Sequence, residues 1–229
     1  MMNNHFSTSR AMALRVPLLL AMVTAVILGL ASLRPVLAAG QDNAGQEWPA
    51  PQKTGVFTHT AKAIPPVISP IFTPEVQAWS ADIIRWAAQF NLNPNHVALI
   101  MQIESCGWAQ AVSGAGAQGL FQVMPFHFAE GENMLDPDIN ARRGLTYFAE
   151  GLSQLGDPAL AFAGYNGGHG TAVSPPATWP EETKRYHQWA LGILNDLGAG
   201  LTQSPTIQAW LAAGGDSLCQ KAAAALRSP

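Results

Sequence analysis

The sequence predicts an all-α domain over residues 74–200, and three observations support this. Apolar residues recur at spacings of three and four along several segments, which is the period of helices that bury one face. Asn93, Asp136 and Asp157 each precede a proline, a pair that is typical of a helix start. Segments with the alternating pattern of a half-buried strand are hard to find. A single domain of this size lies within the ordinary size range.

The first two predicted helices differ in how much apolar surface they carry. The first begins near Pro74 and has one apolar face, which is formed by Val76, Trp79, Ile83, Trp86, Ala87 and Phe90. The second follows Asn93-Pro94 and is apolar almost all round, as expected of a helix packed on several sides. We therefore place the second helix at the centre of the domain.

Three further helices are predicted before residue 200. The helix after Asp136-Pro137 has an inner face formed by Ala141, Leu145, Phe148, Leu152 and Leu155. The helix over residues 159–164 is apolar throughout and should be buried. The last one begins near Glu182 and places on one face Tyr186, Trp189, Ala190, Ile193 and Leu197.

Residues 1–38 have the pattern of an export signal. Arg10 and Arg15 precede an almost wholly apolar run, residues 16–33, and small residues precede Ala39. The run is long for a cleaved signal and short for a membrane span. A signal peptide and an uncleaved membrane anchor formed by residues 16–33 therefore both remain open. In either case we expect an exported protein that is secreted, periplasmic or attached to the cell envelope.

The two segments that flank the helical domain are predicted to be a linker and an extension. Residues 39–73 contain five prolines and show no sustained periodicity, which is typical of an extended linker. Residues 201–229 form a C-terminal helical extension, with a short helix around Ile207 and an Ala-rich helix that carries Cys219. No internal repeat is evident.

The charge of the chain disfavours nucleic acid as a partner. The chain has 12 basic and 15 acidic residues, and removal of residues 1–38 takes away three arginines and no acid. The remaining chain has a formal charge of −6, whereas phosphate binding needs a basic surface. No Cys/His set has the spacing of metal ligands, so we expect no metal and no other cofactor.

Glu104 is the first candidate for catalysis. It extends the apolar stripe of Val97, Ile100 and Met101 and lies at the predicted C-terminal end of the central helix, before Gly107. Burial and the negative end of the helix dipole both disfavour the charged carboxylate. Both effects raise the pKa of Glu104, as a general acid that works near neutral pH requires.

Small residues follow this helix. Residues 113–117 read Ser-Gly-Ala-Gly-Ala, which lets backbone or substrate come close, and Gln118 and Gln122 lie among apolar neighbours. We interpret this segment as the floor of a site.

The order of these residues resembles a known family. Glu104-Ser105, Ser113 and the run from Gly114 to Pro125 are similar to the catalytic motif of soluble lytic transglycosylases, in the goose-type lysozyme superfamily. The family usually has Met at the position of Phe121. The resemblance extends from about residue 74 to about residue 195. It implies a lysozyme-like helical fold, a lytic transglycosylase catalytic domain at residues 74–200 and peptidoglycan glycan strands as the partner.

Two further motifs match the same family. Tyr165-Asn166 resembles the Tyr-Asn motif that faces the catalytic Glu, with Gly167 and His169 where Ala and Pro are common. We interpret His169 as a loop residue. Glu182, Thr183 and Tyr186 resemble the third motif, in which the Glu lines the groove. Residues matched within the helix after Asp136 are assigned to structure: Asn140, Gly144 and Tyr147.

The resemblance implies a mechanism with a single carboxyl group. Glu104 protonates the oxygen between N-acetylmuramic acid and N-acetylglucosamine and then acts as base for the 6-hydroxyl of the muramic residue, which leaves a 1,6-anhydro end. Ser105 and Tyr186 support the site. The substrate-binding residues that it implies are Ser113, Gln122, Met124, Tyr165, Asn166 and Glu182.

Two other functions remain open from the sequence. One is a goose-type muramidase that uses water, in which an acid from the loop between Glu130 and Asp138 faces Glu104. The other is a cell-wall binding module without catalytic activity. We also expect a monomer, and export favours a disulfide between Cys106 and Cys219, the only two cysteines.

Overall fold

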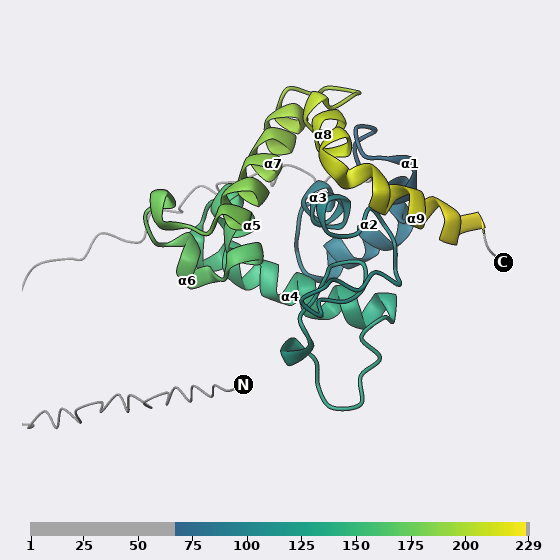
Figure 1. Cartoon of the computed structure of the whole chain (residues 1–229), viewed down its shortest axis with the longest axis horizontal. Helices are drawn as coiled ribbons and strands as arrows, with labels where there is room; N and C mark the ends of the chain where they lie inside the picture. The colour runs from purple at the N-terminus through teal and green to yellow at the C-terminus, as the bar shows by residue number, and fades with distance from the viewer. Residues whose placement is uncertain (1–66, 228–229) are drawn as a thin grey trace, which may run out of the picture. The chain divides into compact units, whose positions relative to one another are not determined.

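The computed structural model describes residues 67–227 (Figure 1). The predicted signal or anchor and most of the predicted linker lie outside the described residues. Within residues 67–227, no helix is both long enough and apolar enough to cross a membrane.

The described residues are helical, which confirms the predicted all-α class. Between residues 67 and 227 no sheet forms, and strand-like pairing is limited to isolated β-bridges of Gln118 with Val112 and Val123. The α-helices are α1 (Pro74–Gln77), α2 (Ser80–Gln89), α3 (Pro94–Glu104), α4 (Pro137–Leu155), α5 (Pro158–Gly167), α6 (His169–Ala172), α7 (Glu181–Gly198), α8 (Pro205–Trp210) and α9 (Asp216–Arg227).

The three predicted helix starts are confirmed. The Asn93 side chain accepts a hydrogen bond from the backbone N–H of Asn95 and caps α3. Asp136 accepts from two backbone N–H groups at the start of α4, and Asp157 accepts from the N–H of Leu160 in α5. Each cap satisfies N–H groups that have no partner within the helix.

The first predicted helix is two helices in the structure. The chain leaves helical geometry at Trp79, between α1 and α2. The Ser80 hydroxyl donates to the carbonyl of Gln77, and such side-chain bonds compete with helix continuation. At the break, the Trp79 indole N–H donates to the carbonyl of Gly107, at 3.0 Å. The first helical segment thereby supports the chain just beyond Glu104.

The central position of α3 is confirmed. Its residues from Val97 to Gln102 are all buried, and it packs against α1, α2 and α7 (Figure 1). The one polar side chain in that run, Gln102, accepts a hydrogen bond from the backbone N–H of Thr73 at 3.0 Å. Burial of nearly every face fixes this helix, and with it the position of Glu104 at its end.

Helix α5 packs against both α4 and α7. Its buried residues run from Ala161 to Gly164, and neighbouring apolar side chains of α4 include Leu145 and Phe148. The predicted helix over 159–164 continues to Gly167, so Tyr165 and Asn166 lie on its last turn.

The C-terminal helices pack on the same core. Ile207 of α8 is buried in the apolar cluster that contains the α3 side chains, and α8 contacts α7. The backbone turns at Gly214, which has a φ of 124°, and α9 then contacts α1. Residues 205–227 therefore contribute to the core around the catalytic helix.

Candidate active site

Glu104 opens into a pocket of about 280 Å³. All six residues predicted to bind substrate line this pocket, together with Ala115 and Ala117: Ser113, Gln122, Met124, Tyr165, Asn166 and Glu182. They come from the loop after α3, the end of α5 and the start of α7. The fold thus brings together three segments that are distant in sequence.

The environment of Glu104 favours the protonated acid. The pKa of Glu104 is raised from 4.5 to about 8, and burial is the largest cause. A hydrogen-bonding interaction with Tyr186 lowers this pKa, and the charge of Glu182 raises it. Burial has the largest effect because a carboxylate loses its hydration there. At neutral pH most molecules therefore carry a proton on Glu104, and the side chain remains partly exposed to the pocket. A proton donor that reaches a cavity is what general-acid catalysis requires.

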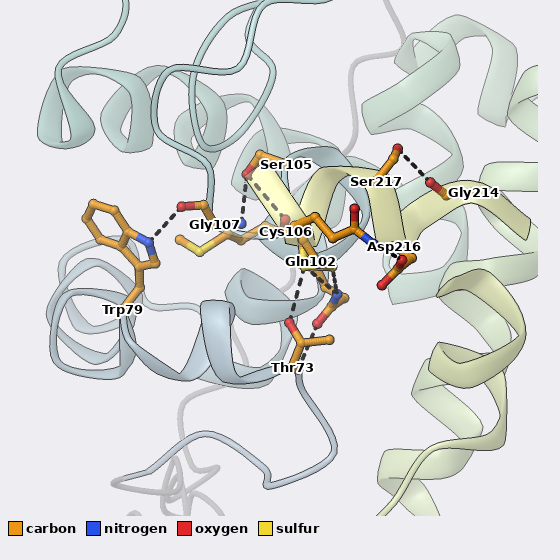
Figure 2. Close-up of a disulfide and its surroundings, with 12 residues drawn as sticks. Thr73, Trp79, Gln102, Ser105, Cys106, Gly107, Gly214, Asp216 and Ser217 are labelled. Atoms are coloured by element: carbon orange, nitrogen blue, oxygen red, sulfur yellow. Dashed lines mark hydrogen bonds between the residues drawn. A yellow bond between two sulfur atoms is a disulfide. The ribbon is translucent and has the colours of Figure 1, made fainter. Parts of the chain in front are cut away.

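Ser105 makes hydrogen bonds just beyond the end of α3. Its hydroxyl donates to the carbonyl of Leu120 at 2.7 Å. It also accepts from the N–H of Gly107 at 3.1 Å (Figure 2). Gly107 has a φ of +84°, and a Cβ there would lie 2.8 Å from the carbonyl oxygen of Glu75. The chain after Glu104 therefore needs glycine for its sharp turn against α1.

Cys106 and Cys219 form a disulfide in the structure (Figure 2). It joins α9 to the chain two residues after Glu104, and both cysteines are buried. The Gln102 amide donates to the Cys106 sulfur at 3.3 Å. Glu75 lies close to both sulfur atoms, but these are bonded to each other and offer no thiolate to a metal.

Asn140 of α4 holds the loop that forms the pocket floor. Its side chain accepts from the N–H of Phe121 at 2.8 Å and donates to the carbonyls of Gln118 and Met134. A Cβ on Gly119 would lie 2.4 Å from the Asn140 amide nitrogen, so only glycine fits beside it. Three hydrogen bonds from one buried side chain agree with the structural role predicted for Asn140.

Gln122 is held at the pocket wall by its own loop. Its φ of 44° is uncommon for a residue other than glycine. Its amide donates to the carbonyls of Ala111 and Gly119 at 3.2 and 3.0 Å. These bonds offset the backbone strain and keep the side chain facing the cavity.

The Tyr165 hydroxyl donates to the carbonyl of Phe121 at 2.7 Å, so its proton is engaged by the loop rather than by Glu104. Burial, followed by the charge of Glu104, raises the pKa of Tyr165 well above 10. Asn166 accepts from the Thr183 hydroxyl at 2.9 Å, which ties the end of α5 to the start of α7. Both residues contribute to the pocket wall.

Tyr186 lies on α7 and is buried in the core. Its hydroxyl interacts with the Glu104 carboxyl closely enough to lower the pKa of Glu104. The contact falls short of full hydrogen-bond geometry, and the hydroxyl has no other partner among the described residues. Tyr186 is thus placed to donate to the carboxylate once Glu104 has lost its proton.

The acids of the loop between Glu130 and Asp138 do not line the pocket. Glu132 binds Arg142 and Arg143, and its hydrogen bond from Arg143 lowers the pKa of Glu132 to about 2. Asp136 caps α4, and Asp138 accepts from Arg85 and Trp86. The second carboxyl group in the pocket is instead Glu182, which lies on α7.

Other residues near the site were not singled out from the sequence. A second hollow adjoins the pocket and adds Ile103, Arg185 and Trp189 to its wall. Arg185 and Trp189 lie three and seven residues after Glu182, a spacing that places all three on the same face of α7. This spacing can be read from the sequence and could have identified both residues. The interpretation of His169 as a loop residue was wrong, because His169 begins the short helix α6. It stacks on Tyr147 with ring centroids 4.2 Å apart and does not line the pocket.

Comparison with known proteins assigns the domain to a family. Residues 82–187 match the model of the transglycosylase SLT domain. These residues form a transglycosylase SLT domain. A transglycosylase from Enterobacteria phage PRD1 is 36% identical over 110 residues, which are 47% of this chain and 40% of that protein. The SLT match and the helical fold together confirm the predicted resemblance and the lysozyme-like class.

A solved structure is also similar. It is an inactive mutant of the lytic transglycosylase Slt from Pseudomonas aeruginosa, with a TM-score of 0.44 and 25% sequence identity. The similarity covers 55% of this chain and 25% of that one. The chain therefore spans less than half the length of each of these two proteins.

Proposed function

We propose that the protein is a lytic transglycosylase that cleaves the bond between N-acetylmuramic acid and N-acetylglucosamine in peptidoglycan. The observation that carries the proposal is Glu104, whose raised pKa and pocket position are those of a general acid, within an SLT domain. Both the phage relative and the Pseudomonas protein are named as transglycosylases.

The proposed reaction uses Glu104 twice. Its proton moves to the glycosidic oxygen as the bond from that oxygen to C1 of the muramic residue breaks, and groups of the muramic residue stabilise the positive charge. The 6-hydroxyl oxygen then bonds to C1, and its proton returns to Glu104. No water is consumed and the acid is regenerated, so the product ends in a 1,6-anhydro ring.

One property of the substrate and one residue of the pocket support this sequence of steps. The 6-hydroxyl belongs to the sugar that is attacked, and an intramolecular nucleophile has a high effective concentration when the sugar is held in place. Gln122, Tyr165 and Glu182 are the residues we propose to hold it. Tyr186 would stabilise the Glu104 carboxylate between the two proton transfers by donating a hydrogen bond.

A muramidase is the second candidate, because Glu182 provides another carboxyl group in the same pocket. In a hydrolase the second carboxylate orients a water molecule towards C1. The acids predicted for this role, between Glu130 and Asp138, do not line the pocket. A hydrolytic mechanism would therefore depend on Glu182 alone.

We also propose that the protein acts outside the cytoplasm. The sequence of residues 1–38 and the cell-wall substrate support this, and the disulfide between Cys106 and Cys219 suits an oxidising compartment. Residues 16–33 would serve as a cleaved signal or as an anchor, with residues 39–73 as a linker to the domain.

Digestion in water labelled with ¹⁸O tests the proposal. A transglycosylase incorporates no label into new glycan ends, because water does not attack C1. A hydrolase places one ¹⁸O at each new reducing end. Binding without release of fragments would instead identify a binding module.

A further inference from the structure

The pocket continues along α7 into a second hollow of about 220 Å³. The pocket and the second hollow share three lining residues, Glu104, Asn166 and Glu182. A polymer bound at Glu104 can therefore extend continuously into the second hollow. The additional residues are Ile103, Arg185, Tyr186 and Trp189. We call this hollow the α7 subsite.

Arg185 is the positive charge of the α7 subsite. It is exposed and forms no ion pair with any residue between 67 and 227. Glu181 is close enough to interact with it, but the Glu181 carboxylate binds Lys184 at 2.7 Å. Glu182 lies three residues before Arg185 and makes no ion pair with it either. The guanidinium therefore keeps its hydrogen-bond donors available to a ligand.

The neighbours of Arg185 suit an amphipathic ligand. Trp189 lies one turn further along α7 and is half-buried, so one part of its indole is covered while the rest faces the hollow. Ile103 adds apolar surface from the catalytic helix. Tyr186 is 6% exposed, and its hydroxyl lacks a partner at hydrogen-bond geometry. A planar indole beside a free guanidinium can take the apolar face of a sugar together with a carboxylate.

We propose that the α7 subsite binds the carboxylate-bearing side arm of a muramic residue, with Arg185 as the group that recognises the carboxylate. This rests on the proposed function, because it takes peptidoglycan as the ligand. The carboxylate has two sources: the lactyl group of a muramic residue without a peptide, or the stem peptide attached to that group. Glu104 is protonated near neutral pH, so Glu182 is the one fixed negative charge of the pocket that opposes the ligand.

Binding in a Glu104→Gln background tests this inference without turnover. Three ligands are compared by calorimetry: glycan strands with stem peptides, strands stripped by an amidase so that the lactyl carboxylate is free, and chitin oligosaccharides, which carry no carboxylate. Arg185→Gln is the test variant. Arg227→Gln is the matched control, since Arg227 is an α9 arginine that lines a different hollow.

The inference predicts that Arg185→Gln weakens binding of a carboxylate-bearing strand by about tenfold or more, because a charge-assisted hydrogen bond is lost. Binding of chitin oligosaccharides stays unchanged, and Arg227→Gln affects none of the ligands. Loss confined to peptide-bearing strands assigns the stem peptide, and loss confined to stripped strands assigns the lactyl group. Equal loss on all three ligands, or no loss on any, overturns the inference while the proposed function stands. If the parent binds no peptidoglycan strand, the proposed function fails and the inference fails with it.

Discussion

Glu104 and Glu182 line one pocket, and the negative charge of Glu182 adds to burial in raising the pKa of Glu104. The two carboxyl groups lie on different helices, at the end of α3 and the start of α7. Tyr186, one turn after Glu182, lowers the pKa of Glu104. Beyond the effect of burial, the acid strength of Glu104 is therefore tuned by two residues on one face of α7.

The first prediction concerns the pH dependence of kcat/KM. Activity should fall as pH rises through about 8, because the general acid loses its proton there. Glu182→Gln removes a nearby negative charge and should move this alkaline limb to lower pH. Tyr186→Phe removes the interaction that lowers the pKa and should move the limb to higher pH.

Glu130→Gln is the control for these shifts, since Glu130 is exposed and does not line the pocket. If the alkaline limb stays in place in both test variants, neither Glu182 nor Tyr186 tunes the pKa of Glu104, and the prediction is wrong.

The second prediction concerns Glu104 itself. Glu104→Gln should bind peptidoglycan and fold normally but lose at least about 10⁴-fold in turnover, because one residue serves as acid and base and each role contributes ~10²–10⁴-fold. Release of soluble fragments measures turnover, and circular dichroism checks the fold. A variant that keeps a tenth of the activity would exclude Glu104 as the sole acid/base.

The third prediction concerns stability. Glu104 has a pKa of about 8 in the folded protein and 4.5 as its usual value, so the folded state binds more protons between these limits. Stability from this group is therefore fully present below about pH 4.5 and falls as pH rises towards about 8. Glu104→Gln carries no titrating group, so its Tm relative to wild type should rise across this window. A constant difference in Tm from about pH 5 to about pH 9 would contradict the raised pKa.

The fourth prediction concerns the disulfide. Unfolded, unreduced protein should titrate with no free thiols, and two free thiols would refute the pairing of Cys106 with Cys219. Cys219→Ala should lower the free energy of unfolding by roughly 4–5 kcal/mol, because the bond closes a loop with a sequence separation of 113. Reduced wild type provides the comparison, since Cys219→Ala should add little to the loss that reduction alone causes.

Much of the fold was predictable because it depends on local patterns. The caps at Asn93, Asp136 and Asp157 need only a side chain and the N–H groups that follow it. The burial of α3 follows from its nearly continuous apolar surface. The break at Trp79 was not predicted, because the apolar residues on either side of it keep the same helical period. The bond from the Trp79 indole to the carbonyl of Gly107 could not be predicted either, because the two residues are distant in sequence.

Some features of the site were likewise predictable from the sequence, and others were not. Glu104 could be identified from its place on an apolar stripe, and the motif resemblance named the residues that share its pocket. The engagement of the Tyr165 hydroxyl by Phe121 could not be predicted, since it depends on how α5 meets the loop. The packing of Ile207 into the core could not be predicted either, because the pattern of a short amphipathic segment does not show which part of the protein it packs against.

The chemical form of the new glycan end tests the central claim most directly. Residues 39–229 of the chain are incubated with purified peptidoglycan, and the released muropeptides are analysed by mass spectrometry before and after treatment with borohydride. If the muramic 6-hydroxyl replaces the departing sugar at C1, with Glu104 as acid and then base, the fragments will be one water lighter than hydrolysis products. These fragments will also resist reduction. Predominantly reducible ends with the mass of hydrolysis products would contradict the transglycosylase mechanism and favour a muramidase that uses Glu182.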